Sequence, residues 1–594
     1  MHDVREDFFS GLLVAAVAAA VFVPGLGSYT LIDRDEPRFA EAGRLMYETG
    51  DWIVPRFNGE VRYHKPPMLY WLMCAGYAVF GVNETGARSV SAAMAVGSCI
   101  VVFLIARSMF TRRAALISGL ISATTLLVFI EGRIATADSL LLATVLLMFW
   151  GFQRIVIGRN GVGSFLLLYG GLAAGSLTKG PVSASVLIVA VGLYALMRRE
   201  RPPAARAIDG GRLRRLLRRL RAELAPWRRE VRAVAGELHL AAGLAAAAAV
   251  TLGWFIPAIV KTDGGFLTEG LLRHVGERAF VRDYEGHGGV PVVFYVILLP
   301  LFFFPWFAVL PESLVQMWRS KGRNRRAFLL AWGMAPFLVF SFLRTKLPHY
   351  VLPAYPAFAI ICGAMLDGIL DTRRSLWRTP AGKLGLILFG LMGAGAAAGL
   401  AALPRSAQLG PVAGAAVAPA VVLLVMTALV LVDFVRGNVL RGSVAMAVLM
   451  VGAAVVVSLR MAPALEELYT IKNLALDIRE EYAGQHVVCL GLKEHASMVF
   501  YLQQDVPFIR RADEVAVGRL DQQAVFTVKP AGSADEIRRS MPLLCIATRK
   551  EAGKLAGLGE SAREVRRLEC FGISQMKWHQ LALWEITAPP EPAQ

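Results

Sequence analysis

The feature that most constrains this chain is a series of long, uninterrupted apolar runs. Each run holds about 17–25 residues, the length that a helix needs to cross a lipid bilayer. Of the 594 residues, 56% are hydrophobic and 18% are charged, whereas soluble domains average about 25% charged residues. The composition therefore excludes a soluble enzyme, a disordered tail and a nucleic-acid-binding module.

Thirteen stretches have the length and composition of membrane-spanning helices. They cover residues 8–27, 88–107, 113–130, 139–157, 164–177, 180–197, 238–260, 291–311, 327–344, 350–366, 383–403, 411–433 and 441–459. The sequence thus predicts a polytopic all-α membrane protein with about 13 transmembrane helices. Because residues 1–27 lack a small-residue cleavage site, we expect a retained first helix rather than a removed signal peptide.

Positive charge predicts which side each loop occupies, because Lys and Arg favour the cytoplasmic loops of membrane proteins. The net charge is +18. Five basic clusters fall on one side if there are thirteen spans and a cytoplasmic N-terminus: residues 112–113, 198–232, 319–326, 373–378 and 436–441. We therefore expect residues 1–460 to form a transmembrane domain with a basic cytoplasmic loop at 198–236. The loop is typical of a segment that lies on anionic lipid rather than on nucleic acid, since its basic stretch holds a single aromatic residue, Trp227.

Residues 67–81 form a shorter, aromatic-rich apolar stretch. Counting it as a crossing reverses the side of every later loop. We therefore interpret residues 28–87 as an outer-face loop with an interfacial helix, in which Tyr70, Trp71 and Tyr77 lie at headgroup depth. A tilted short span is the alternative.

After residue 460 the apolar runs shorten to the length of strands. Strands are predicted at 486–492, 524–530, 542–548 and 581–587, and helices at 494–503 and 533–540. The alternation is typical of a small α/β domain, and the span count places this domain, residues 461–594, outside the cytoplasm. An oxidising compartment permits one disulfide among Cys489, Cys545 and Cys570, and three free thiols are the alternative.

Charged residues gather in six segments on the predicted outer side. They lie within residues 33–44, 62–67, 131–138, 273–287 and 344–350, and at Lys179. Charge next to a bilayer is costly and is usually functional. Structural alternatives are the first turn of a helix for Asp35 and Glu36, a helix cap for Asp138 and a snorkelling side chain for Lys179. The double proline after Lys65 predicts an extended backbone at His64 and Lys65.

Together these segments offer aspartates beside a surplus of Lys, Arg, His and Tyr. Cations near a bilayer surface suit a phosphate carried on a lipid. Carboxylates beside them suit the activation of an acceptor or the stabilisation of charge on a sugar carbon. Because the sequence shows no phosphate-binding glycine loop and no serine-hydrolase pattern, a nucleotide cofactor is not expected.

Five short motifs, in order, resemble the GT-C membrane glycosyltransferases of the protein O-mannosyltransferase superfamily. They are Asp35–Glu41 (DEPRFAE), Gly50–Pro55 (GDWIVP), Tyr63–Pro67 (YHKPP), Thr178–Pro181 (TKGP) and Lys346–Tyr350 (KLPHY). Within the superfamily, the chain most resembles the bacterial 4-amino-4-deoxy-L-arabinose (aminoarabinose) transferases that modify lipid A. The resemblance implies thirteen spans, a periplasmic C-terminal domain and a place in the bacterial inner membrane.

The resemblance also implies roles for particular residues. Asp35 and Asp138 resemble the family's two catalytic acids. The residues expected to bind the donor phosphate or substrate are Arg38, Arg62, Lys65, Lys179, Arg278, Lys346 and Tyr350. A divalent metal such as zinc is implied at His64 and His274, although the family usually has Glu at the position of His64 and often Tyr at that of Phe39.

The leading hypothesis is an inverting transferase that moves a sugar from a polyprenyl phosphate to a lipid or glycan acceptor, most simply aminoarabinose from undecaprenyl phosphate to lipid A. The alternative enzyme moves another sugar, such as mannose or galacturonic acid, to protein, lipopolysaccharide core or another glycan. A lipid or sugar flippase is the alternative from another class. It is disfavoured because the middles of the spans are nearly free of charge and no inverted repeat is visible.

Overall fold

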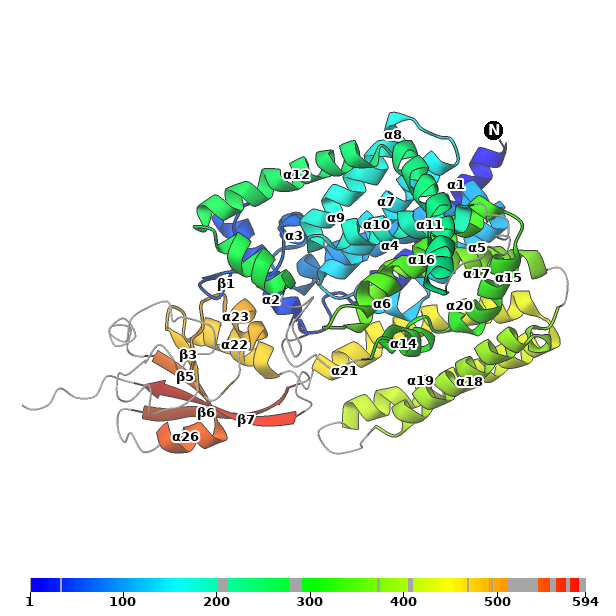
Figure 1. The fold of residues 1–594 in the computed structure, drawn as a ribbon. Helices are drawn as coiled ribbons and strands as arrows, with labels where there is room; N and C mark the ends of the chain where they lie inside the picture. Colours follow the sequence, from blue (N-terminus) through cyan, green and yellow to red (C-terminus); the bar gives the residue numbers. More distant parts are fainter. Residues whose placement is uncertain are drawn as a thin grey trace, which may run out of the picture.

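The fold is known from a computed structural model and consists of a large helical body with a small sheet at one end (Figure 1). The structure describes residues 2–32, 35–199, 212–276, 291–370, 374–403, 410–466, 470–490, 492, 495–509, 543–555, 562–572 and 577–586.

Every stretch predicted to span the membrane contains helix. The matching elements are α1 (His2–Phe22), α4 (Glu84–Met109), α5 (Arg112–Ala123) with α6 (Leu126–Glu131), α7 (Ala137–Val156), α8 (Val162–Phe165) with η1 (Leu166–Gly170) and α9 (Gly171–Lys179), α10 (Val182–Arg198), α12 (Leu240–Lys261), α14 (Phe294–Phe302) with η4 (Trp306–Ala308), α16 (Arg323–Ser341), η5 (Pro348–Ala354) with α17 (Tyr355–Ile369), α18 (Pro380–Ala401), α19 (Gly410–Arg436) and α20 (Val439–Val456). The other described helices up to residue 466 are α2 (Asp35–Thr49), α3 (Met68–Phe80), α11 (Arg212–Glu237), η2 (Phe266–Val275), α15 (Leu310–Arg319), η6 (Leu376–Arg378), η7 (Val457–Met461) and, at the start of the C-terminal unit, α21 (Ala462–Glu466).

Among the described helices, seven are long and apolar enough to cross a membrane. They are α4, α7, α12, η5 with α17, α18, α19, and α20 with η7. The chain is therefore a multi-pass membrane protein. Whether all thirteen stretches cross, and which side each loop occupies, stay predictions, because helix length and composition do not fix the number of crossings.

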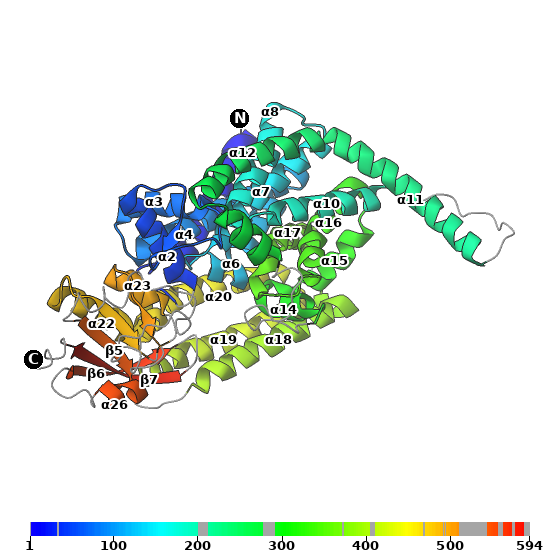
Figure 2. The ribbon, with the colours of Figure 1, turned by 60° about the vertical axis from the view of Figure 1, so that its left-hand side comes forward.

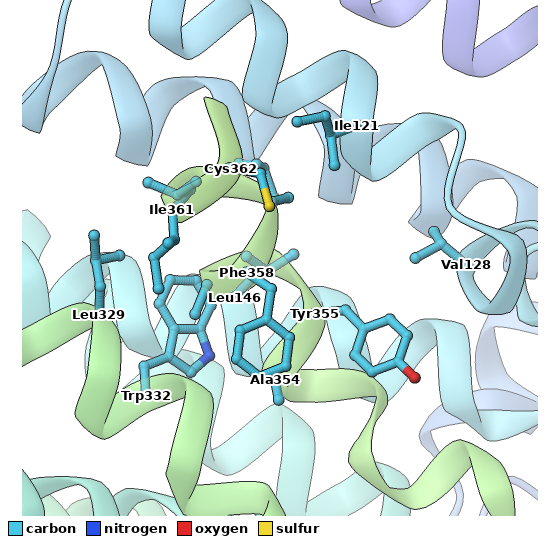
Figure 3. Close-up of a cluster of buried hydrophobic side chains, with 14 of the residues drawn as sticks. Ile121, Val128, Leu146, Leu329, Trp332, Ala354, Tyr355, Phe358, Ile361 and Cys362 are labelled. Atoms are coloured by element: carbon cyan, nitrogen blue, oxygen red, sulfur yellow. The ribbon is translucent and has the colours of Figure 1, made fainter. Parts of the chain in front are cut away.

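The core of the body is built from large aromatic side chains. Trp332 of α16 stacks on Phe149 of α7, with ring centroids 4.7 Å apart. Its indole N–H donates to the Pro353 carbonyl of η5 at 2.8 Å. Figure 3 shows Trp332 beside Phe358 and Tyr355 of α17 in the same apolar cluster. This packing holds η5, the segment with the KLPHY motif, against α7 and α16.

Residues 67–81 form α3 as a helix, but its tyrosines do not lie at a surface. Tyr70 and Tyr77 are buried, because α3 packs against α2 and α4. The Tyr77 hydroxyl donates to the Ala40 carbonyl at 2.8 Å. Trp71 is half-buried and donates to the Trp52 carbonyl at 2.8 Å. The aromatic residues of this helix therefore serve mainly to pack it into the protein.

The described part of the basic loop after residue 211 forms one long helix, α11, that stands apart from the body. Figure 2 shows α11 extending away from the other helices, and its last turns pack on α10. There Arg198 pairs with Glu230 at 2.9 Å, and Trp227 donates to the Gly192 carbonyl at 3.0 Å. The extended placement leaves most of this basic helix outside the packed helical body.

The C-terminal residues form a five-stranded mixed sheet in the order β4-β3-β5-β7-β6. β3 pairs in parallel with β4 and β5, while β7 is antiparallel to β5 and β6. The strands are β3 (Val487–Leu490), β4 (Phe508–Ile509), β5 (Leu543–Thr548), β6 (Ala562–Gly572) and β7 (Lys577–Ile586), with helices α22 (Thr470–Glu481), α23 (Ala496–Leu502) and α26 (Arg549–Leu555).

Three of the predicted strands and one predicted helix of this unit are therefore confirmed, and the fold is α/β. The predicted strand at 524–530 and helix at 533–540 lie outside the described residues. Cys489 and Cys545 are buried free thiols on neighbouring strands, so neither forms a disulfide within the described chain. The side chain of Cys570 lies outside that part.

The C-terminal unit shares a core with the helical body. α23 packs on α2, and one apolar cluster joins them, with Phe39 and Tyr70 on one side and Tyr501 and Phe508 on the other. Asn58, in the turn of the small hairpin β1 (Arg56–Phe57) and β2 (Glu60–Val61), exchanges two hydrogen bonds with the Val506 backbone, at 2.7 and 3.1 Å. The sheet domain is thus attached to the segment that carries the first three motifs.

Candidate active site

Asp35 is placed by an anchor next to it in the sequence. It begins α2 and is exposed, whereas the following residue, Glu36, is buried. Both carboxylate oxygens of Glu36 accept from the fully buried Arg88 of α4, at 2.8 and 2.9 Å. Glu36 also accepts from the backbone N–H groups of Ile32 and Ala135, at 2.8 and 2.6 Å. The first turn of α2 is therefore fixed, and Asp35 is held at its end.

A second buried arginine fixes the segment before Asp35. Arg133 donates to the carbonyls of Val21, Phe22 and Pro24 at 2.7–3.2 Å. The first two of these carbonyls end α1, where helical carbonyls have no partner within the helix. Arg133 thus caps α1 and directs the chain toward α2.

Asp138 and Lys179 form the centre of the site. Asp138 lies in the first turn of α7, and its Oδ1 is 2.5 Å from Nζ of Lys179 at the end of α9. Gly180 ends α9 with a φ of +67°, a left-handed conformation that glycine adopts without strain. The alternatives of a helix cap for Asp138 and a snorkelling side chain for Lys179 are therefore not their main roles, because the two charges face each other inside the protein.

His349, Tyr350 and Glu131 complete the cluster from two further elements. Nε2 of His349 is 3.7 Å from Asp138, and its Nδ1 is 3.7 Å from Glu131 at the end of α6. The Lys179 ammonium lies 5.0 Å from the centre of the Tyr350 ring, a cation–π contact. The KLPHY motif therefore meets the TKGP motif at Asp138.

Asp35 and Lys65 lie near the same cluster. The charges of both residues act on His349, and the charge of Lys65 also acts on Asp138. The backbone at Lys65 is a bend that follows a turn at Tyr63 and His64. The prediction of an extended backbone was wrong for His64, because proline restricts only the residue directly before it, which here is Lys65. Of the nine predicted catalytic and substrate-binding residues, the structure thus brings five together: Asp35, Lys65, Asp138, Lys179 and Tyr350.

The other predicted substrate-binding residues have contacts of their own. Arg38 lies one turn after Asp35 on the same face of α2. Arg62 donates to the Tyr70 hydroxyl at 3.0 Å and stacks on Phe39 at 4.9 Å, so it packs between α2 and α3. Lys346 is buried and donates to the Leu343 carbonyl at 2.7 Å. Burial, with a smaller contribution from Arg344, lowers the pKa of Lys346.

The proposed metal ligands do not form a complete set within the described part of the chain. His64 is exposed, and the side chain of His274 and all of Arg278 lie outside the described residues. η2, which contains position 274, packs its Phe266 ring 5.2 Å from the ring of Tyr63. No group of three His, Cys, Asp or Glu side chains suited to a metal occurs among the described residues.

Several residues of the site were given no role from the sequence. Arg88 sits at the end of a predicted span, where a charged side chain is itself a signal of an internal partner. Glu131 was noted only within the charged segment 131–138, and His349 only as part of a motif. Their partners are distant in sequence, as in the 52-residue separation of Arg88 from Glu36, so local patterns could not pair them.

Comparison with known proteins shows what this arrangement is similar to. Residues 64–207 match the family model of the dolichyl-phosphate-mannose-protein mannosyltransferases. The structure is similar to that of ArnT from Cupriavidus metallidurans bound to undecaprenyl phosphate, with a TM-score of 0.72, 22% identity, and coverage of 96% of this chain and 97% of ArnT. The chain therefore resembles these mannosyltransferases in sequence over residues 64–207, and it has the fold of ArnT.

Two relatives in sequence carry a more specific name. The undecaprenyl phosphate-alpha-4-amino-4-deoxy-L-arabinose arabinosyl transferase of Serratia proteamaculans is 28% identical over 389 residues, which are 64% of this chain and 63% of that protein. The enzyme of the same name from Edwardsiella ictaluri is 27% identical over 356 residues, 59% of this chain and 58% of that protein. The chain thus matches less than two thirds of the length of these relatives.

Proposed function

We propose that this protein transfers 4-amino-4-deoxy-L-arabinose from undecaprenyl phosphate to lipid A at the periplasmic face of the bacterial inner membrane. The observation that carries the proposal is the Asp138–Lys179 ion pair beside His349 and Tyr350, with the charges of Asp35 and Lys65 close enough to act on His349. The fold and the names of the relatives support the choice of donor and acceptor.

The cations of the cluster suit the leaving group. When the bond between the sugar C1 and the phosphate oxygen breaks, the lipid phosphate gains negative charge. Lys65, with Arg38 nearby on α2, supplies positive charge for it, and such charge-assisted contacts act most strongly where water is excluded. Lys179 is already paired with Asp138, so its role is to hold that carboxylate and the Tyr350 ring in place.

The two aspartates have different environments and therefore different roles. Asp138 is almost buried and neutralised by Lys179, which makes it a poor proton acceptor. Asp35 is exposed at the start of α2 and is held there by Glu36. We assign to Asp35 the role of general base, whose carboxylate accepts the proton of the acceptor hydroxyl. As this proton leaves, the oxygen of the acceptor bonds to the sugar C1 from the side opposite the phosphate. Asp138 stabilises the positive charge that develops on the sugar.

The orientation in the membrane is part of this proposal. Residues 28–87 and the C-terminal domain, 461–594, are assigned to the periplasm, and the basic loop 198–236 to anionic lipid on the cytoplasmic side. A cysteine placed in the exposed part of the sheet domain should react with an impermeant thiol reagent in intact spheroplasts. Labelling of α11 with protection of the sheet domain would reverse the assignment of the site.

A transfer assay tests the proposal directly. The purified protein in nanodiscs should convert undecaprenyl phosphate-linked aminoarabinose and lipid A into lipid A with one added pentosamine, with undecaprenyl phosphate released in equal amount, as measured by mass spectrometry. Asp35→Asn serves as the inactive variant. Asp51→Asn is the matched control, because Asp51 lies in the same loop but pairs with Lys261 at 3.3 Å.

A second candidate function follows from the family model, which is named for mannose transfer to protein. Donors that carry mannose or galacturonic acid, offered with protein or lipopolysaccharide core, form the other arms of the assay. Transfer from one of them and none from the aminoarabinose donor would correct the sugar while keeping the site. Movement of the donor across the bilayer without transfer would instead indicate a flippase.

A further inference from the structure

The C-terminal domain contacts the short segment that leads into Asp35. We call residues 26–32 the lead-in loop, because they join the end of α1 to the start of α2. The loop is held by side chains from two parts of the protein, the helical body and the C-terminal unit. The backbone N–H and carbonyl groups of the loop are therefore hydrogen-bonded by residues of both parts.

From the helical body, Arg88 binds the loop at several points. Its guanidinium donates to the carbonyls of Leu26, Tyr29 and Thr30 at 2.8–3.0 Å while it pairs with Glu36. The loop and the first turn of α2 thus share one anchor. Any shift of the loop on this side is transmitted to Glu36 and so to Asp35, the adjacent residue.

From the C-terminal unit, Tyr501 of α23 binds the same loop. Its hydroxyl accepts the Leu31 N–H at 2.9 Å and donates to Glu84 at 2.9 Å. Burial raises the pKa of the Tyr501 hydroxyl, so the hydroxyl stays protonated and can make both bonds. Glu84 begins α4, the helix that also carries Arg88.

A charged bridge beside Tyr501 holds the neighbouring peptide. Glu466, at the end of α21, accepts from both the N–H and the hydroxyl of Thr30, at 2.5 and 2.9 Å. Lys472 of α22 links Glu466 to Glu84, at 3.2 and 2.7 Å. Burial lowers the pKa of Lys472, but the two carboxylates outweigh it and raise the pKa overall. The Lys472 ammonium therefore stays charged at neutral pH.

We infer that Tyr501, Glu466 and Lys472 are positioning residues for the transfer reaction, which act through the lead-in loop on Asp35. The carbonyl of Thr30 accepts from Arg88, and the N–H and hydroxyl of Thr30 donate to Glu466. The loop therefore has a single position only when the C-terminal unit is docked on the helical body. The C-terminal domain is thus part of the catalytic unit, although its residues do not touch the reacting atoms. The inference rests on the function proposed above.

Tyr501→Phe is the primary test, because it removes one hydroxyl and keeps the ring that packs in the shared core. In the full-length protein in nanodiscs, kcat should fall by roughly 10-fold or more, since small errors in the position of a catalytic group are costly. The KM for the lipid-linked donor should change less than kcat, because Lys65 lies outside α2. Tyr482→Phe, which removes a hydroxyl from the end of α22, is the matched control and should keep the wild-type kcat.

A second pair of variants keeps the test independent of folding. Thr30→Val removes the hydroxyl that Glu466 accepts from, and Thr30→Ser keeps it. We expect Thr30→Val to lower kcat and Thr30→Ser to restore it, at equal thermal stability of the two proteins. Loss of activity in both variants, or in neither, would overturn the inference.

Combining these changes with Asp35→Asn separates positioning from a general structural effect. If Tyr501 acts through Asp35, Tyr501→Phe should lower single-turnover transfer in the wild type but leave the residual rate of the Asp35→Asn variant unchanged. An equal loss in both backgrounds would show a structural role and contradict the inference. Wild-type protein that transfers no sugar from any donor would instead refute the proposed function.

Discussion

Two buried ion pairs in this protein have opposite surroundings. Arg88–Glu36 is enclosed by backbone groups: Arg88 binds three carbonyls and Glu36 accepts two N–H groups. Lys179–Asp138 instead faces the side chains of His349 and Tyr350. The first pair fixes a chain segment, whereas the second is surrounded by further side chains of the proposed site. Burial alone therefore does not distinguish the two pairs, whereas the nature of their partners does.

Replacing each ion pair by apolar residues should show the largest difference between the two pairs. Glu36→Leu with Arg88→Met should abolish folding, because five backbone groups lose their partner and each unsatisfied buried group costs about 1–3 kcal/mol. The expected observation is aggregated protein without a monodisperse peak after solubilisation. A folded double variant would show that the lead-in loop finds other partners.

The same replacement at the second pair should leave the fold intact. A buried ion pair exchanged for apolar side chains of similar size is often neutral for stability. Asp138→Leu with Lys179→Met should therefore keep a thermal transition close to that of the wild type. Turnover should fall by about 100-fold or more, because a charge used in the transition state is lost. Unfolding of this variant would make both pairs structural.

Replacing Lys65 should have a smaller effect on transfer, and this effect should be confined to the binding and departure of the donor phosphate. Lys65→Ala should weaken donor binding and slow phosphate departure by roughly 10- to 150-fold, the value of a charge-assisted hydrogen bond. Lys65→Arg should recover only part, since a planar guanidinium does not replace a compact ammonium. Near-wild-type transfer by both variants, in detergent with purified donor, would leave Lys65 as a lysine that merely attracts anionic lipid.

Replacing Asp51 should have the smallest effect on turnover. Burial raises the pKa of the Asp51 carboxyl, but hydrogen bonds from the Ile53 and Val54 N–H groups and the Lys261 ammonium lower it below its usual range. The stability this provides is present above the usual aspartate pKa and is lost as the pH falls through the lowered one. For an exposed pair it amounts to about 1 kcal/mol at most. Asp51→Asn should thus keep kcat within a few-fold of the wild type and flatten the acid limb of the stability curve.

The sequence was sufficient for much of the fold because apolar length is a local signal. The predicted spans contain helix, and the start of α2 at Asp35 follows from acidic residues in a first turn. The resemblance likewise named Asp35, Lys65, Asp138, Lys179 and Tyr350, which the structure brings together. Motifs were informative because each lies at an end of a helix.

The sequence could not predict which of two adjacent acidic residues anchors the chain and which faces the proposed site. Asp35 and Glu36 are two carboxylates side by side, and only the distant Arg88 shows that Glu36 is the anchor. The role of Tyr501 is equally hidden, because 470 residues separate it from Leu31. Such pairings depend on how helices pack, which composition and periodicity do not report.

The central claim is that Asp35, held by its structural neighbour Glu36, accepts the proton of the acceptor. It is tested most directly by the turnover of Asp35→Asn beside Asp51→Asn in nanodiscs, with donor and lipid A at saturation and thermal unfolding measured on the same samples. The account predicts a loss of about 100-fold or more for Asp35→Asn at unchanged stability, and near-wild-type turnover for Asp51→Asn. Turnover of Asp35→Asn within a few-fold of the wild type would contradict it and reduce Asp35 to the first residue of a helix.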